Sequence, residues 1–229
     1  MKRLAAAFIL GVLAVGAFAP FYLFPLAILA LAALLALAER GAGSRDGFVL
    51  GFAFGLGHFI AGVSWVYVSL HDFGAMPAPA ALGVTLLFCA YLALFPACTL
   101  ALTARASSPG MRRLLVFPGA WVLTEWTRGW LFTGFPWLGI GYSQAAASPL
   151  AGLAPVAGVY GVGLATLASA GLAWQALAGN WRRPAWAPIA GLVLLWGGAG
   201  ALRAIEWTQP EGEPVSVSLL QGNVPQSMK

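Results

Sequence analysis

The chain alternates between long apolar stretches and short breaks that are polar or contain glycine and proline. Most of the apolar stretches are long enough for an α-helix to cross a bilayer, which takes about 20 residues. The first two are short, and Pro20 and Pro25 interrupt the helical pattern between them, so we expect a tight hairpin of two helices there. The pattern predicts an all-α polytopic membrane protein with about seven transmembrane helices. The predicted spans are residues 4–19, 21–38, 47–69, 79–104, 112–128, 150–178 and 185–204.

Composition agrees with a membrane protein and excludes an ordinary soluble one. Of the 229 residues, 60% are hydrophobic and 8% are charged, whereas a soluble globular domain has about 25% charged residues. The formal net charge is +5, but the basic residues occur singly or in pairs and form no stripe that could follow a phosphate backbone. We therefore expect the membrane as a partner and no nucleic acid.

The basic residues predict the orientation of the chain. If the N-terminus is cytoplasmic, nine of the twelve basic residues lie on the inside, as the positive-inside rule favours. The outside then keeps Arg128, Arg203 and Lys229. We expect a bacterial inner (cytoplasmic) membrane protein with an extracytoplasmic C-terminal tail. The inside set is Lys2, Arg3, Arg40, Arg45, Arg105, Arg112, Arg113, Arg182 and Arg183.

The first apolar run also has features of a cleavable signal sequence. Lys2 and Arg3 precede it, and it ends in the small-residue pattern of residues 17–19. Proline follows that pattern directly and further spans come after it. These two features favour an uncleaved first helix.

The C-terminal residues change in character. Residues 206–214 are polar and rich in proline, which is typical of a linker, and Val215, Val217 and Leu219 then alternate with serines. Such alternation predicts a β-strand, and a single strand needs partners. We expect residues 1–205 to form a transmembrane domain, 206–214 a linker, and 215–229 the start of a second domain that these residues do not complete.

No metal site, cofactor or disulfide is expected. Cys89 and Cys98 are nine residues apart in one apolar run, about 13 Å along a helix, which is too far for a disulfide bond. His58 and His71 are too few and too far apart to make a metal site. We expect His58 to make a hydrogen bond within or between helices, and His71 with Asp72 to have a loop role.

The densest polar and aromatic segment is residues 125–144, after the fifth predicted span. Glycine and proline break it too often for a lipid-exposed helix, so we expect it to re-enter the membrane or to line the outer interface. An aromatic belt that anchors a span end is the alternative interpretation. Glu125 and Arg128 are three residues apart and predict an ion pair on one helical face. In the functional alternative, Arg128 binds a phospholipid phosphate and Glu125 orients it.

Three segments resemble apolipoprotein N-acyltransferases, the bacterial inner-membrane family that adds the third acyl chain to lipoproteins. They are residues 133–138 with 141–144, residues 65–69 with 73–77, and residues 217–229. The resemblance implies a helical membrane bundle that carries a periplasmic nitrilase-like domain, an α-β-β-α sandwich inserted before one last span. Its first strand would be residues 215–221.

The resemblance also implies a mechanism. In this family a Glu-Lys-Cys triad in the nitrilase-like domain takes an acyl chain from a phospholipid as a thioester and passes it to the α-amino group of a diacylglyceryl-cysteine. None of the triad positions falls in this chain, because Lys229, Glu125 and Cys98 match other positions. We therefore expect no catalytic residue here and no acyl transfer by these residues alone.

The resemblance further implies a lipid-binding role for the outer segment. Gly134 and Trp137 match family positions implicated in activity, and the same motif contains Tyr142 and Gln144. The expected partners are a phospholipid acyl donor and a diacylglyceryl apolipoprotein acceptor, and the expected state is a monomer. The predicted lipid-binding residues are Glu125, Arg128, Gly134, Phe135, Pro136, Trp137, Tyr142 and Gln144.

Two other classes of membrane protein require features that can be sought in the sequence. A retinal-type pump needs a lysine in the middle of a span, and the only lysines are Lys2 and Lys229. A small transporter or lipid flippase would normally show two repeats with corresponding broken spans, and the sequence shows no convincing repeat. The transporter or flippase remains the alternative hypothesis.

Overall fold

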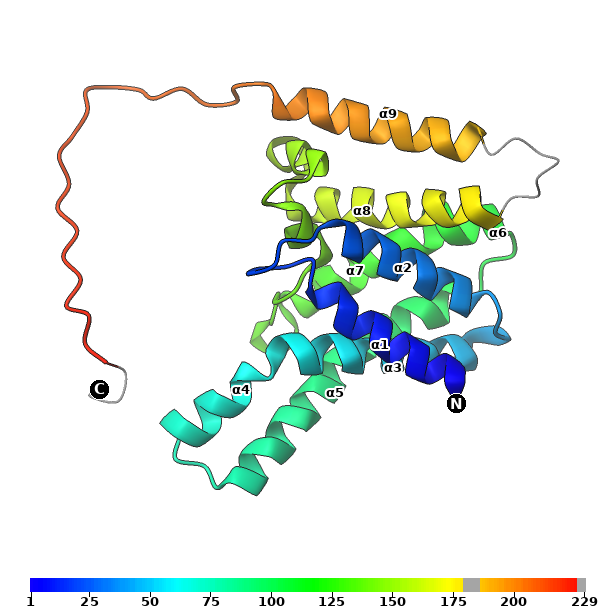
Figure 1. Cartoon of the computed structure of the whole chain (residues 1–229), viewed down its shortest axis with the longest axis horizontal. Coiled ribbons are helices and arrows are strands. Elements are labelled where there is room, and N and C mark those ends of the chain that lie inside the picture. The colour runs from blue at the N-terminus through cyan, green and yellow to red at the C-terminus, as the bar shows by residue number, and fades with distance from the viewer. Residues whose placement is uncertain (179–185, 226–229) are drawn as a thin grey trace.

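The computed structural model describes residues 1–178 and 186–225, and every element assigned in these residues is helical. The longer helices run back and forth across a bundle, so that the N-terminus and the end of α9 lie at opposite ends (Figure 1). They are α1 (Lys2–Val15), α2 (Pro25–Ala38), α3 (Gly43–Val63), α5 (Ala78–Thr103), α7 (Phe117–Arg128), α8 (Ala154–Ala178) and α9 (Trp186–Arg203).

Short helical elements join the longer ones. Two of these elements, η1 and η2, have π-helical hydrogen bonding, and η3, η4 and η5 are 3₁₀ turns. The short elements are α4 (Trp65–Val68), η1 (Ser69–Phe73), α6 (Pro109–Met111), η2 (Arg112–Val116), η3 (Leu131–Thr133), η4 (Ile140–Gln144) and η5 (Pro149–Leu153).

Glycines allow α3 to pack closely between α1 and α5. Gly47, Gly51 and Gly55 recur every four residues on the side of α3 that meets α5. A Cβ atom at Gly51 would collide with the backbone carbonyl of Pro96 in α5, and one at Gly11 of α1 would collide with the backbone of α3. Small residues at such spacing are typical of membrane helices, whose association depends on close packing.

The structure confirms a multi-pass membrane protein and leaves the number of spans as a prediction. In the described residues, four helical stretches are long and apolar enough to cross a membrane: α3, α5, residues 149–178 and α9. α2 is a shorter apolar helix, and α1 and α7 have 14 and 12 residues. The hairpin predicted at the N-terminus is confirmed, because α1 and α2 are separate helices that pack together.

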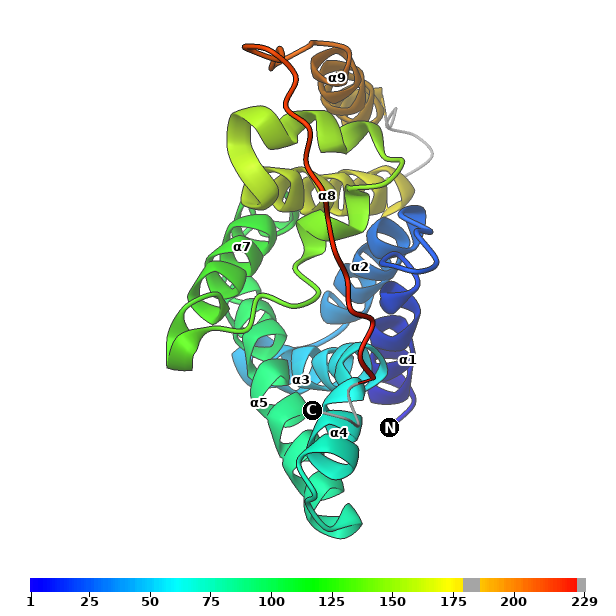
Figure 2. The ribbon, with the colours of Figure 1, turned by 90° about the vertical axis from the view of Figure 1, so that its left-hand side faces the viewer.

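Two predicted spans differ from the helices that form. The apolar stretch 47–69 was expected to be one span, but α3 ends at Val63 and the chain continues through α4 and η1. Together with the first part of α5, these elements form an arm that projects from the bundle (Figures 1 and 2). The stretch 112–128 begins with the π-helical η2 before α7. Hydropathy records burial in lipid or protein, and it does not resolve such changes of helix type.

Residues 206–225 form an extended tail without an assigned strand. Val215, Val217 and Leu219 are exposed. A strand in this segment would need partner strands, which the described residues do not provide. The predicted strand at 215–221 and the division into domains therefore stay predictions. Residues 226–229 belong to the expected start of the second domain and lie outside the described residues, as do Arg182 and Arg183 of the inside set.

Candidate functional site

The segment between α7 and η5 forms an irregular loop at the end of the bundle where α9 ends (Figure 2). Its backbone has positive φ angles at Phe132, Thr133, Gly134 and Leu138. Such angles are uncommon for residues other than glycine and persist where the surrounding structure holds them. We call residues 129–144 the outer loop.

Arg128, the last residue of α7, binds the backbone of the outer loop from the protein interior. Its Nη1 atom donates hydrogen bonds to the carbonyl oxygens of Phe135, at 2.7 Å, and Trp137, at 2.6 Å. The guanidinium also lies over the ring of Phe59, with 5.3 Å from Cζ to the ring centroid. Only 2% of Arg128 is exposed, so its side chain faces the protein interior.

Glu125 holds the other side of the same loop. Its Oε1 atom accepts hydrogen bonds from the backbone N–H of Ile140, at 2.9 Å, and from the indole of Trp121, at 3.0 Å. The same oxygen lies 3.9 Å from Nη2 of Arg128, so the ion pair predicted from the sequence is confirmed. The contact of Arg128 with a lipid phosphate stays a prediction, because the observed contacts of its guanidinium are with the protein.

Gly134 is required by the path of the outer loop. Its φ angle is +81°, and a Cβ atom at this position would collide with the carbonyl of Gly129. A side chain is thus excluded by both backbone conformation and space. Gly134 allows the loop to turn back over the end of α7, where the N–H of Phe135 donates to the carbonyl of Arg128 at 2.9 Å.

Aromatic side chains join the outer loop to the arm. The ring of Trp137 lies 5.4 Å from that of Trp65 in α4, and the ring of Phe135 lies 4.9 Å from that of Phe88 in α5. Contacts of this geometry stabilise beyond simple burial. We call the set the aromatic cluster; it consists of Trp65, Phe88, Tyr91, Phe132, Phe135 and Trp137.

A partly open cleft of about 450 Å³ lies beside the outer loop. The loop contributes one wall, and the connection between α1 and α2 contributes the other. The lining is mainly apolar, and Trp137, which is 51% exposed, belongs to both the cleft and the aromatic cluster. The lining residues are Phe18, Ala19, Tyr22, Pro136, Trp137, Leu138 and Tyr142.

Gln144 does not reach this cleft. Its side chain is fully buried, and its Nε2 atom donates to Oγ of Ser143 at 2.8 Å. Close packing explains its neighbour Gly141, where a Cβ atom would collide with the carbonyl of Val159 in α8. The end of the motif therefore packs the outer loop onto α8, and direct contact of Gln144 with lipid stays a prediction.

Apart from the buried Gln144, the predicted site residues divide into three groups. Pro136, Trp137 and Tyr142 line the cleft, and Phe135 belongs to the aromatic cluster. Glu125, Arg128 and Gly134 shape the loop behind it. Phe18 and Tyr22 also line the cleft and were not predicted to do so. The signal in the sequence was their position beside the proline of a short hairpin.

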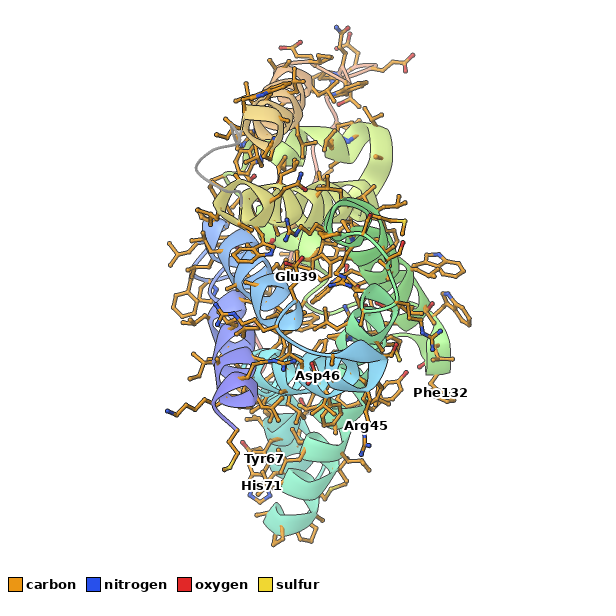
Figure 3. All side chains as sticks on the ribbon, turned by 90° about the vertical axis from the view of Figure 1, so that its right-hand side faces the viewer. Glu39, Arg45, Asp46, Tyr67, His71 and Phe132 are labelled. Atoms are coloured by element: carbon orange, nitrogen blue, oxygen red, sulfur yellow. The ribbon has the colours of Figure 1, made fainter. Side chains whose placement is uncertain are left out.

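His58 has the contact expected of it, whereas His71 and Asp72, expected in a loop, lie in the helical element η1. Nδ1 of the buried His58 lies 3.3 Å from the carbonyl oxygen of Gly11, which confirms a hydrogen bond between helices. His71 is in η1 at the tip of the arm, and its Nδ1 atom lies 2.8 Å from the carbonyl oxygen of Met76 (Figure 3). Across residues 1–178 and 186–225, no group of three His, Cys, Asp or Glu side chains is placed to hold a metal ion.

Nearly the whole sequence is similar to known proteins. The chain is 53% identical over 99% of its length to an apolipoprotein N-acyltransferase of Nitrosomonas europaea, and 46% identical over 99% to one of Chromobacterium violaceum. It covers 45% and 43% of these two proteins, so it spans less than half the length of the curated relatives it matches.

Most of the chain also matches a family of protein domains. Residues 10–172 match the family described as the apolipoprotein N-acyltransferase N-terminal domain. The matched region contains α2, α3, α5, α7, the arm and the outer loop. The chain therefore belongs to the apolipoprotein N-acyltransferase family.

Proposed function

We propose that this chain is the membrane half of an enzyme that transfers an acyl chain from a phospholipid to the N-terminal diacylglyceryl-cysteine of an apolipoprotein. Membership of the family supports the reaction class. The chemistry is assigned to a Cys thioester in a nitrilase-like domain that is expected to start at residue 215, with its catalytic residues beyond residue 229. The described bundle supplies the membrane platform on which that domain rests.

The outer loop is proposed to admit the phospholipid. The position of Trp137 carries this proposal, because its indole is half exposed and forms part of both the aromatic cluster and the apolar cleft. A lipid chain lying in the cleft would contact Pro136, Trp137 and Tyr142. An indole at a lipid–water interface can pack against the chain while its N–H remains near polar groups.

The cleft has the dimensions and lining expected of such a site. Its volume of about 450 Å³ lies within the range of small-molecule pockets, roughly 300–1,000 Å³. Its lining presents little polar surface, which suits an acyl chain and is unsuited to a charged head group. We therefore assign the cleft to the tail of the donor and leave the head group outside it.

Photocrosslinking of a phospholipid to the purified 229-residue chain tests this assignment. A phospholipid with a diazirine in one acyl chain would be irradiated with the protein in lipid nanodiscs, and adducts would be mapped by peptide mass spectrometry. We expect adducts on residues 136–142 and 18–22 that unlabelled phospholipid displaces. Leu87 of α5 is 72% exposed and serves as the control position for contact with bulk lipid.

A matched pair of tryptophan variants distinguishes binding in the cleft from contact with lipid elsewhere. Trp126 and Trp137 are 50% and 51% exposed, but Trp126 is on α7 outside the cleft. Trp137→Ala should reduce the adducts in the cleft several-fold, and Trp126→Ala should leave them unchanged. The assignment would be wrong if adducts in the cleft were displaced no more readily than those at Leu87.

A further inference from the structure

We propose that Arg128 and Glu125 are positioning residues that hold the outer loop in the one conformation that presents Trp137 to the cleft. This inference rests on the proposed function, because it names the residues that set the geometry of the same lipid-binding cleft. It assigns the buried ion pair to the backbone of the loop, in place of the lipid phosphate of the functional alternative.

The two side chains fix the loop around three of its four cleft-lining residues; the fourth, Tyr142, lies beyond the attachment at residue 140. Arg128 binds the carbonyls of residues 135 and 137, and Glu125 binds the N–H of residue 140. Pro136, Trp137 and Leu138, the consecutive loop residues that line the cleft, lie within this interval. The attachment points and the lining residues therefore belong to the same short stretch of backbone.

Each attachment satisfies a backbone group that lacks another partner. Within the part of the chain that the structure describes, no backbone N–H donates to the carbonyls of Phe135 and Trp137. The hydrogen bonds to the carbonyls of Phe135 and Trp137 are partly buried and the one from Ile140 is buried, and a backbone group left without a partner in such surroundings is destabilising. Arg128 and Glu125 thus remove the penalty that would otherwise oppose this conformation of the loop.

The backbone between the attachments is strained and needs such support. Leu138 has a φ angle of +56°, an unfavourable value for a residue with a branched side chain. Its side chain packs against α3, where a Cβ atom at Gly62 would collide with it. Without the hydrogen bonds at 137 and 140, the loop would relax toward ordinary backbone angles and move Trp137.

The shape of the guanidinium explains why the residue is arginine. One nitrogen reaches two carbonyls, Nη2 faces Glu125, and the planar group lies over Phe59. A lysine ammonium is a compact charge on a flexible stem and cannot reproduce this planar arrangement. Arg128→Lys should therefore keep the charge and lose part of the positioning.

The position of the loop can be measured independently of lipid binding. In a background with Cys89→Ala and Cys98→Ala, spin labels would be attached through Thr133→Cys in the loop and Ser107→Cys after α5. Both positions are exposed. Pulsed electron paramagnetic resonance then gives the distribution of distances between the loop and the opposite end of α5.

Four proteins are compared in this assay: the parent, Arg128→Met, Arg128→Lys and Glu125→Gln. We expect one narrow distribution for the parent, a broad or shifted one for Arg128→Met and an intermediate one for Arg128→Lys. Glu125→Gln should stay close to the parent, because an amide oxygen can still accept from Ile140. The same order should hold for displacement of the photoreactive phospholipid, with about a tenfold loss of affinity for Arg128→Met, equivalent to one charge-assisted hydrogen bond.

The outcomes separate this inference from the proposed function. A folded Arg128→Met or Arg128→Lys protein with the parental distance distribution would overturn the positioning role. If Arg128→Met does not fold, Arg128→Lys still decides. Broadened distances in the Arg128 variants of a chain that binds no phospholipid would support positioning while contradicting the lipid assignment.

Discussion

The guanidinium of Arg113 donates two hydrogen bonds, both 2.7 Å long, to the carboxylate of Glu39, which lies 74 positions earlier in the chain. The indole of Trp174 donates a third at 2.9 Å. These contacts join the end of α2 to η2 and α8 at the end of the bundle opposite the cleft (Figure 3). Each end of the bundle thus contains a largely buried ion pair between a glutamate and an arginine.

Replacing Glu39 should destabilise the bundle. Glu39→Gln loses the charge that Arg113 faces, and both side chains are largely buried, with 15% and 13% exposed. We expect the free energy of unfolding to fall by on the order of 2 kcal/mol, the value for a hydrogen bond to a charged group. Unfolding in mixed micelles of increasing SDS fraction measures this change. Glu206→Gln, an exposed position beyond α9, is the control.

The same contact predicts a pH dependence of stability. Burial raises the pKa of Glu39, but the hydrogen bonds from Arg113 and Trp174 and the charges of Arg113 and Arg112 lower it more, so the net pKa lies below its ordinary value. The stabilisation is present above the ordinary pKa and is lost as the pH falls through the lowered one. Unfolding curves at a series of acidic pH values should show this loss in the parent and a smaller one in Glu39→Gln.

Substitution of Gly134 should damage the outer loop and spare the helices. Gly134→Ala forces a Cβ atom against the carbonyl of Gly129 at a positive φ angle, at a cost of about 1–3 kcal/mol. We expect the loop distances between spin labels to broaden while the circular dichroism of the helices is unchanged. Gly83→Ala in α5, where a Cβ atom meets nothing, is the matched control. Parental distances in Gly134→Ala would show that the loop tolerates a side chain.

The purified 229-residue chain should not transfer acyl groups. Cys89 is buried and Cys98 is on the exposed surface of α5, so neither is presented in the cleft. Incubation with phospholipid and a diacylated lipopeptide, followed by mass spectrometry, should give no triacylated product. Formation of that product by the parent and its loss in Cys89→Ala or Cys98→Ala would place a nucleophile in the membrane half.

The orientation of the bundle is open to a direct test. In the cysteine-free background, Arg45→Cys reports the end that carries the N-terminus, and Glu211→Cys reports the tail. A maleimide that cannot cross membranes should label Glu211→Cys in cells with a permeabilised outer membrane. It should label Arg45→Cys only after the inner membrane is opened. The reverse pattern would contradict a cytoplasmic N-terminus.

The sequence predicted the helical membrane class because hydropathy measures the property that places helices in lipid. It predicted the Glu125–Arg128 pair because residues three apart share a helical face. It could not predict that the pair binds the backbone at residues 135, 137 and 140, because those contacts depend on a loop with several positive φ angles. The Glu39–Arg113 contact was missed for a similar reason, since nothing local relates residues 74 positions apart.

The boundaries of the helices were less predictable than their existence. The apolar stretch 47–69 gave no sign that α3 would end at Val63 and the chain continue as an arm, because the sequence of α4, residues 65–68, continues the apolar run without a polar break. The sequence also indicated only one of the two walls of the cleft. The motif at 136–142 marked one wall, and the wall formed by Phe18 and Tyr22 required the hairpin of α1 and α2 to fold back beside the loop.

We propose that Trp137 positions the phospholipid donor for acyl transfer. The most direct test of this proposal is the single-turnover rate of acyl transfer in an active full-length protein, made of residues 1–229 followed by the remaining half of the Nitrosomonas europaea relative. We expect Trp137→Ala to slow acyl transfer by roughly tenfold, the loss of about 1.4 kcal/mol of transition-state stabilisation, and Trp126→Ala to leave the rate within twofold, about 0.4 kcal/mol. Equal rates for Trp137→Ala and the parent, with both proteins folded, would contradict the proposal.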